Sequence, residues 1–223
     1  MQVSSLLCPL CQHDGHQFYH QDNNKRTQRI YLRCQQCQLV FVPAEFYLSA
    51  EDEKAEYDLH ENNVLDDGYR RFLERFWLPL KSKLKPNSHI LDFGCGPGPL
   101  LGQMMQEDGF HVSLYDHFYH HNPEVLKPNF YDAISTTEVI EHLHQPCDVF
   151  ESWLNWIKPG GYLAVMTKLV TTQAAFTKWH YKNDLTHVCF YSEATFAWLA
   201  NRYGLHMTRD AQDVTLFRLP SRV

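Results

Sequence analysis

One segment of the sequence, in which an apolar run ends in three closely spaced glycines, restricts the possible fold more than any other. Residues 89–93 are typical of a buried strand, Gly94, Gly96 and Gly98 follow, and residues 100–107 have the pattern of a helix. Glycine allows a tight turn and a close approach of the backbone to a ligand, and the first turn of a helix offers N–H groups without intrahelical partners. The segment therefore predicts the strand–turn–helix unit of a nucleotide-binding α/β fold.

Short strands and helices alternate through the rest of the C-terminal part. Further strands are predicted over residues 109–116, 131–136, 162–168 and 214–218, and further helices over 66–84, 147–157 and 192–203. Strands that alternate with helices are typical of a mostly parallel sheet with helices on both faces. We therefore predict the fold class α/β, with a Rossmann-like domain over residues 64–223.

Two classes of cofactor fit a glycine turn of this kind. A dinucleotide site requires a third glycine at the position of Pro99. The acid Asp92 precedes the glycines, and a carboxylate there would repel a pyrophosphate but can balance the ammonium group of a methionine moiety. A second acid, Asp116, closes the next predicted strand, where acids accept hydrogen bonds from ribose hydroxyls. These residues favour S-adenosylmethionine, with a nicotinamide oxidoreductase or a turn without ligand as the alternatives.

Together these motifs resemble the class I methyltransferases that use S-adenosylmethionine, and the resemblance covers about residues 64–218. In that family the acid and the glycines of the turn hold the methionine moiety, and the acid that closes the second strand holds the ribose. The donor-binding residues that the resemblance implies are Asp92, Gly94, Gly96, Gly98, Asp116 and Thr137. Residues 117–130 depart from the family pattern because they carry no clear strand and no acid–amide pair, so the usual adenine contact is not assigned.

A cluster of acids and histidines follows the predicted strand 131–136. If the chain is helical from residue 139, Glu138, Glu141 and His142 share one face. With His187 they resemble the metal-binding set of the small-RNA terminal 2′-O-methyltransferases, and the ubiquinone-biosynthesis O-methyltransferases carry a similar stretch. The resemblance implies that these four residues hold a second divalent metal, which would lower the pKa of a bound hydroxyl.

The alternative for this cluster needs no metal. Glu138 and His142 would then shape the acceptor pocket, or His142 alone would act as a general base. In either case Glu138 and His142 are the candidate catalytic residues.

Four of the seven cysteines form two Cys-x-x-Cys pairs near the N-terminus, Cys8 with Cys11 and Cys34 with Cys37. Two such pairs can deliver four thiolates to a tetrahedral zinc ion. The alternatives are a redox pair, which is disfavoured because no βαβ unit surrounds it, and a ribbon that has lost its metal. We therefore predict a zinc-ribbon-like module over residues 1–42. An acidic stretch over residues 43–63 is expected to be a solvated linker or an exposed helix.

Similar four-cysteine modules precede the methyltransferase domain in some deoxysugar C-methyltransferases and ribosomal-RNA methyltransferases, which implies a role in substrate recognition. Lys25, Arg26, Arg29 and Arg33 concentrate positive charge in this module. They could meet phosphate groups of RNA or of a nucleotide sugar, or form a solvated face. The formal net charge of −6 argues against a protein that binds nucleic acid mainly by neutralising phosphates.

The sequence as a whole predicts a methyltransferase that acts on an oxygen of a small metabolite, in preference to a nitrogen or carbon. An RNA methyltransferase or an RNA-binding module is the alternative. The chain has no apolar run of about 20 residues that could span a bilayer. Residues 1–9 also lack the basic and long apolar regions of a signal peptide, so we expect a cytoplasmic protein without a membrane partner. The sequence does not predict the oligomeric state.

Overall fold

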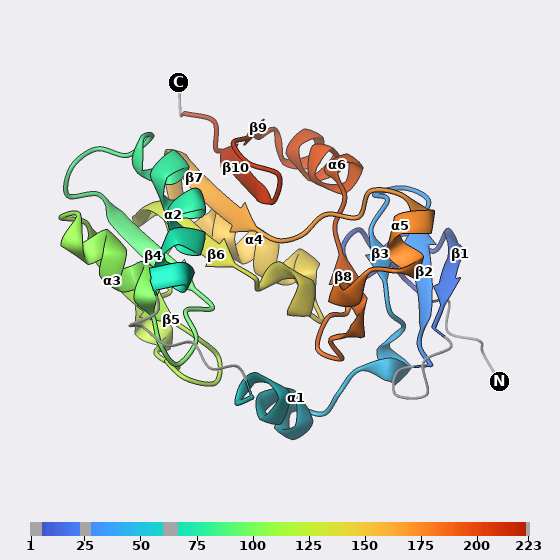
Figure 1. Cartoon of the computed structure of the whole chain (residues 1–223). Coiled ribbons are helices and arrows are strands. Elements are labelled where there is room, and N and C mark those ends of the chain that lie inside the picture. Colours follow the sequence, from blue (N-terminus) through green and yellow to red (C-terminus); the bar gives the residue numbers. More distant parts are fainter. Residues whose placement is uncertain (1–5, 23–27, 60–66, 222–223) are drawn as a thin grey trace. The chain divides into compact units, whose positions relative to one another are not determined.

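A computed structural model describes residues 6–22, 28–59 and 67–221 of the chain. The chain divides into two compact units (Figure 1). The first comprises Met1–Leu59, Ile140–Val149 and Lys168–Leu199, and the second comprises His60–Val139, Phe150–Thr167 and Ala200–Val223. The first unit therefore includes two segments from the residues that the sequence assigns to the Rossmann-like domain, and each unit is described by itself.

The second unit is built on a six-stranded sheet with the order β5-β4-β6-β7-β10-β9. Its strands are β4 (His89–Phe93), β5 (His111–Tyr115), β6 (Tyr131–Thr137), β7 (Ile157–Met166), β9 (His206–Arg209) and β10 (Val214–Arg218). Strand β4 is parallel to β5 and β6, and β6 is parallel to β7, whereas β10 runs antiparallel to β7 and β9. The prediction of an α/β fold with a mostly parallel sheet is confirmed.

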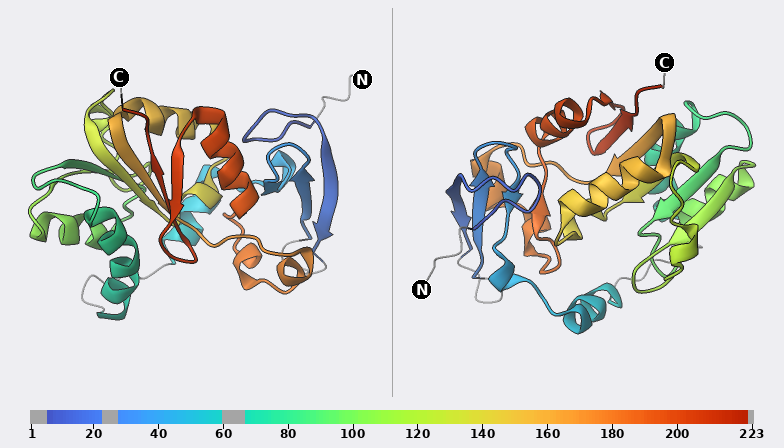
Figure 2. Two further views of the ribbon diagram at one scale, coloured as in Figure 1. Left: turned by 90° about the horizontal axis from the view of Figure 1, so that it is seen from above. Right: turned by 180° about the vertical axis from the view of Figure 1, so that it is seen from behind.

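Helices lie on both faces of this sheet (Figure 2). On one face α2 (Asp67–Lys81) and α3 (Leu100–Glu107) pack onto β4, β6, β7 and β10 through one buried apolar cluster. On the other face α4 (Pro146–Trp156) contributes Trp153, whose ring centroid lies 5.3 Å from that of Phe93 on β4. Helix α2 forms where apolar residues recur every three or four positions, because this spacing places them on one face.

Two parts of this unit are less regular. Residues 158–161 lie within β7, which begins before the predicted strand 162–168; here the pairing with β6 shifts register and Gly160 has a φ of +80°. Residues 117–130 are all described and contain no strand, only the short 3-10 helix η2 (Pro123–Val125) and turns. The sheet therefore ends at β5, as the departure from the family pattern suggests.

The first unit contains a four-stranded antiparallel sheet with the order β1-β2-β3-β8. Its strands are β1 (His16–Gln21), β2 (Ile30–Cys34), β3 (Val40–Phe41) and β8 (Cys189–Phe190). The rings of Tyr31 and Phe190 pack at 5.7 Å, and both contact Phe176 of α5 (Gln173–Thr177). Because β8 and α5 come from far along the chain, the N-terminal strands share their apolar core with downstream residues.

Within the stretch 43–63 the structure has a helix without buried residues, α1 (Ala50–Tyr57), while residues 60–63 lie outside the described residues. Ser49 caps the helix, since its side chain accepts a hydrogen bond from the backbone N–H of Asp52. Helix α6 (Glu193–Tyr203) begins in this unit and ends in the other. Among the described residues, no helix is long and apolar enough to cross a membrane.

Candidate functional site

The glycine turn after β4 has the conformation that its residues predict. Gly94 and Gly96 have φ values of +75° and +65°, in the left-handed region that favours glycine. A Cβ atom on Gly94 would lie 2.3 Å from a methyl group of Val139, so the packing also excludes a side chain there. The backbone N–H of Gly94 donates to the carbonyl oxygen of Tyr115 at 2.8 Å, which joins the turn to the end of β5.

Asp116, the residue after β5, stabilises the same turn by hydrogen bonds to its buried carboxylate. Its Oδ2 accepts a hydrogen bond from the backbone N–H of Gly96 at 2.9 Å. Its Oδ1 accepts from the N–H groups of Phe118 and Tyr119 at 2.9 and 3.1 Å. An acid and a glycine turn therefore meet at the carboxyl ends of adjacent parallel strands, where α/β sheets bind nucleotides.

Asp92 lies at the other side of the turn, inside the unit. Its Oδ1 accepts a hydrogen bond from the hydroxyl of Ser135 at 2.8 Å, and the backbone of Gly102 in α3 is a second partner. Burial raises the pKa of Asp92 from 3.8 to about 6, against the lowering effect of these hydrogen bonds. Asp92 thus ties β4 to β6 and α3, and its effect on a bound ammonium group stays a prediction.

The raised pKa makes the stability of the chain depend on pH. An acid whose folded-state pKa exceeds its unfolded value loses stability as the pH rises between the two values, here from 3.8 to about 6. At pH 7 the ionised Asp92 therefore costs about 3 kcal/mol. Asp92→Asn removes this cost, because an amide can donate to Ser135 while the serine hydroxyl donates to the carbonyl oxygen of Leu91, 3.3 Å away.

Denaturant unfolding of Asp92→Asn is therefore expected to show a higher free energy of unfolding than wild type at pH 7. The difference should disappear below pH 4. A difference that is constant over this pH range would show that ionisation of Asp92 is not its cause.

The segment after β6 does not form the predicted helix. Thr137 is the last residue of β6, and the backbone N–H of Glu138 donates to the carbonyl oxygen of Met166 at 2.8 Å. This bond keeps Glu138 beside β7, and its φ of +52° turns the chain into a single 3-10 turn, η3 (Ile140–His142). The expectation that Glu138, Glu141 and His142 share one helix face is therefore wrong. Glu138 belongs to the second unit, and the other two residues belong to the first.

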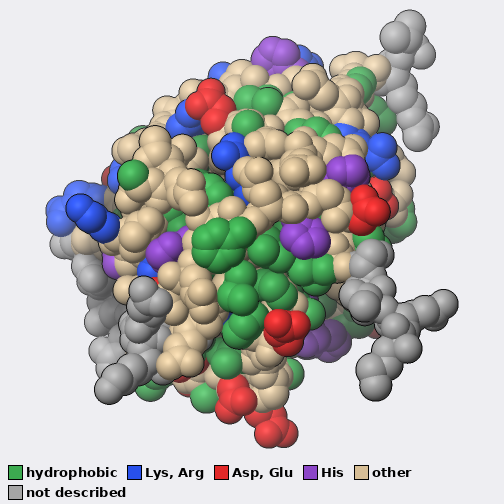
Figure 3. Space-filling view, turned by 90° about the vertical axis from the view of Figure 1, so that its right-hand side faces the viewer, with side chains coloured by type: hydrophobic (Ala, Val, Ile, Leu, Met, Phe, Trp, Pro, Cys, Tyr) green, Lys and Arg blue, Asp and Glu red, His purple; other side chains and the backbone are tan. Residues whose placement is uncertain are grey.

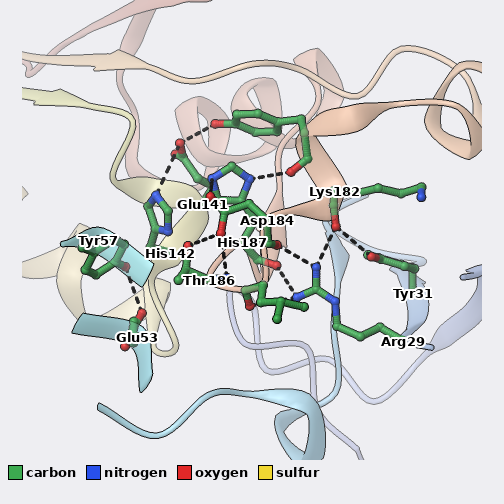
Figure 4. A network of polar contacts seen from close by, with 12 residues as sticks. Arg29, Tyr31, Glu53, Tyr57, Glu141, His142, Lys182, Asp184, Thr186 and His187 are labelled. Atoms are coloured by element: carbon green, nitrogen blue, oxygen red, sulfur yellow. Dashed lines mark hydrogen bonds and ion pairs between the residues drawn. The ribbon is translucent and has the colours of Figure 1, made fainter. Parts of the chain in front are cut away.

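Glu141, His142 and His187 come together within the first unit (Figure 4). The atoms that each could offer to a metal ion all lie within 4.8 Å of one another. Glu141 is fully buried, and the hydroxyl of Tyr181 donates to its Oε1. His142 Nε2 lies 4.0 Å from the same oxygen, and the rings of the two histidines are 4.6 Å apart.

His187 is held in one tautomer. Its Nδ1 lies 2.7 Å from the carbonyl oxygen of Tyr181, which can only accept, so Nδ1 carries the proton and Nε2 keeps its lone pair. Burial lowers the pKa of His187 to about 4, so the ring is neutral at pH 7. Asp184 Oδ2 lies 3.7 Å from Nε2. The set formed by Glu141, His142 and His187 combines a carboxylate with imidazoles, and such ligands suit divalent metals.

Several residues of this cluster were not found from the sequence. Tyr57 of α1 lies edge-on to His142, with ring centroids 5.2 Å apart, and its hydroxyl donates to Glu53. Tyr181 and Asp184 come from the segment before β8. Neither the spacing of these residues nor any motif marks them, because only the folded chain brings α1 and this segment to η3.

The four cysteines of the N-terminal pairs also cluster in the first unit. The Sγ atoms of Cys8 and Cys37 are 3.5 Å apart, those of Cys11 and Cys34 are 3.4 Å apart, and all four lie within 4.8 Å of one another. Tetrahedral zinc with bonds of about 2.3 Å requires sulfur atoms about 3.8 Å apart. The geometry of the cluster therefore fits a zinc ion.

Of the four basic residues in the hairpin between the cysteine pairs, the structure describes Arg29 and Arg33. Arg29 is buried, and its guanidinium donates to backbone carbonyl groups, so the expectation that it could meet phosphate is wrong. Arg33 lies 5.8 Å from the ring of Tyr19. Lys25 and Arg26 lie outside the described residues.

Comparison of the sequence with known proteins identifies relatives of this chain. Residues 60–209 match a family model described as a methyltransferase domain. A ubiquinone biosynthesis O-methyltransferase of Xylella fastidiosa (strain M23) is 29% identical over 116 residues, which cover 40% of this chain and 45% of that protein. The equivalent enzyme of Xanthomonas campestris pv. campestris (strain B100) is 29% identical over 118 residues, or 41% and 47% of the two chains. The alignments thus span about half the length of these curated relatives.

Solved structures show the same fold. An O-methyltransferase family protein from Burkholderia thailandensis has a TM-score of 0.56 at 12% identity, covering 81% of this chain and 63% of that one. The 1,6-didemethyltoxoflavin-N1-methyltransferase of the same organism, solved with 1,6-didemethyltoxoflavin and S-adenosylhomocysteine, has a TM-score of 0.54 at 14% identity, covering 82% and 96%. Because the family model spans more than half of the sequence, the chain belongs to the methyltransferase-domain family.

Proposed function

We propose that this chain transfers the methyl group of S-adenosylmethionine to an oxygen atom of a small metabolite. The observation that carries the donor assignment is the hydrogen bond between Gly96 N–H and Asp116, which fixes a carboxylate beside a left-handed glycine turn. The family match and the S-adenosylhomocysteine in one solved neighbour support the same donor. In this proposal the turn seats the methionine moiety, Asp116 accepts from the ribose hydroxyls and Thr137 lies beside them.

An oxygen acceptor is favoured by the acid–histidine cluster. A hydroxyl must lose its proton to become a nucleophile, whereas an amine needs only to be neutral. His187 offers a neutral Nε2, and Glu141 offers a buried carboxylate. The printed names of the curated relatives also point to O-methylation. The toxoflavin enzyme methylates nitrogen on the same fold, so the acceptor atom must be tested.

The cluster can act in two related ways. A divalent metal, when bound by Glu141, His142 and His187, would lower the pKa of an acceptor hydroxyl. His187 Nε2 or His142 can also take the proton directly. Along the chain Glu141 follows Thr137 by only four positions. Glu138 stays a candidate for shaping the acceptor pocket or completing the ligand set.

The four cysteines are proposed to hold a structural zinc ion, on the basis of their sulfur distances. RNA is the second candidate acceptor, and the structure favours it less. Arg29 is buried, and in the face seen in Figure 3 the described Lys and Arg side chains are scattered among acidic and histidine side chains. We also propose that the protein acts in the cytoplasm.

Incubation with methyl-labelled S-adenosylmethionine and a fractionated cell extract tests the proposed acceptor. Label is expected in small hydroxylated metabolites, and Asp116→Ala should abolish its transfer. Label in RNA would support RNA as the acceptor. Label in amines would show that the acceptor atom is nitrogen and not oxygen.

His187→Ala is expected to lower kcat by about 10²–10⁴-fold, because the variant loses a base or a metal ligand. The affinity for S-adenosylmethionine should stay within twofold, since the residues proposed to bind the donor are unchanged. His180→Ala is the matched control, because His180 is exposed and lies in the same segment. Equal kcat values for His187→Ala and His180→Ala would remove His187 from the catalytic group.

A further inference from the structure

Arg29 is one of the largest fully buried side chains of the protein, with an exposed fraction of 1%. It lies just before β2, in the hairpin that connects the two cysteine pairs. Its Nη1 donates to the carbonyl oxygens of Leu185 and His187 at 2.9 and 3.1 Å. Its Nη2 donates to those of Lys182 and Asp184, both at 2.7 Å. One guanidinium therefore holds four carbonyl groups of a segment more than 150 positions away (Figure 4).

The segment that Arg29 holds carries His187, a member of the Glu141–His142–His187 cluster, and Asp184, whose Oδ2 lies 3.7 Å from His187 Nε2. It has little regular structure, since it runs from the short 3-10 helix η4 (His180–Asn183) to the two-residue strand β8. Carbonyl groups in such a segment lack the partners that a helix or sheet supplies. The planar guanidinium of arginine has five N–H donors in a fixed geometry and can bind four carbonyl groups at once, whereas a lysine ammonium has only three donors.

Two further contacts from the same hairpin hold this segment. The hydroxyl of Tyr31 donates to the carbonyl oxygen of Lys182 at 3.1 Å. The side chain of Lys182 pairs with Asp22 at 3.1 Å, and both residues are buried. Asp22 also donates its backbone N–H to the carbonyl oxygen of Arg29, which closes the hairpin at its base. The hairpin between the cysteine pairs is thus attached to the 182–187 segment by three side chains.

We propose that Arg29 is a positioning residue that fixes the 182–187 segment, so that the cysteine module sets the geometry of the Glu141–His142–His187 cluster. The module then supports this cluster, and its hairpin residue Arg29 is not a phosphate ligand. The expected effect of Arg29 on methyl transfer rests on the proposed function. Its role in holding the 182–187 segment does not.

Hydrogen exchange of the full-length protein, measured by mass spectrometry, tests this role without any activity assay. In Arg29→Met the backbone amides of His187 and Val188 are expected to exchange at least tenfold faster than in wild type, because the segment opens more often. Arg29→Lys should restore part of the protection. The matched control is Arg33→Met, because Arg33 belongs to the same hairpin strand and contacts the Tyr19 ring.

A second readout reports on His187 itself. In ¹⁵N-histidine NMR spectra of wild type, the His187 ring should show a protonated Nδ1 that exchanges slowly, because this atom donates to the Tyr181 carbonyl. The signal should broaden or disappear in Arg29→Met and persist in Arg33→Met. If Arg29→Met does not fold, Tyr31→Phe removes one bond to the same segment and should accelerate the same amides about threefold.

Unchanged exchange at residues 187 and 188 in the Arg29 variants and in Tyr31→Phe would overturn the proposal, as would equal acceleration in Arg33→Met. Faster exchange together with a fall in kcat and an unchanged affinity for S-adenosylmethionine supports both the positioning role and the proposed function. Faster exchange in a protein that transfers no methyl group would uphold Arg29 as a positioning residue and count against the proposed function alone.

Discussion

Asp116→Ala is expected to weaken the binding of S-adenosylmethionine by at least 100-fold, which corresponds to about 2.7 kcal/mol. The variant loses the acceptors proposed for the ribose hydroxyls, and hydrogen bonds to a charged group contribute about 1.5–3 kcal/mol each. It also removes the carboxylate to which the N–H groups of Gly96, Phe118 and Tyr119 donate, so the turn itself loosens. Calorimetric titration with S-adenosylmethionine and S-adenosylhomocysteine measures the effect.

Asp132→Ala is the matched control for this change. Asp132 is an acid of the same unit, near the start of β6, and its carboxylate accepts from Lys158 and from the backbone N–H of His89. Because it lies at the opposite end of the parallel strands from the glycine turn, its loss should leave the affinity within twofold. The zinc content of Asp116→Ala should equal that of wild type. An affinity for the donor that is unchanged in Asp116→Ala would remove this residue from the site.

Cys34→Ser is expected to remove bound zinc and unfold the cysteine module. Four thiolates on zinc provide an apparent free energy of about 10–16 kcal/mol in small modules, and loss of one ligand forfeits most of it. Cys34 is fully buried at the end of β2, so the change also reaches the strand that follows Arg29. Elemental analysis should find one zinc per wild-type chain and none in the variant, and circular dichroism should report the lost order.

Cys147→Ser provides the control, because Cys147 lies in α4 outside the four-cysteine cluster. Its zinc content should match that of wild type. If Cys34→Ser retained full zinc and an unchanged melting curve, the module would not depend on a metal.

The parts of the fold that local patterns specify were predictable from the sequence. The glycine turn has the positive φ angles that a strand–turn–helix unit requires, and α3 lies at residues 100–107 as predicted. Helix α2 is within a few residues of its predicted bounds, because apolar side chains at spacings of three and four define one buried face. Asp116 lies beside the turn, since the carboxyl ends of neighbouring parallel strands share one edge.

The parts that depend on distant contacts were not predictable. A hydrogen bond from Glu138 to β7 replaces the predicted helix, and the sequence near residue 138 gives no sign of it. From the sequence, Arg29 is predicted to be a surface charge beside Lys25 and Arg26. In the structure its partners are carbonyl groups about 150 residues downstream. Carbonyl groups are common to all residues, so no side-chain pattern could have indicated this bond.

Titration of the purified wild-type chain with S-adenosylhomocysteine, with NAD as the competing ligand, tests the central claim most directly. The account predicts saturable binding of one S-adenosylhomocysteine per chain that NAD does not displace. Binding of NAD in its place, or no binding of either compound by a folded chain, would contradict it.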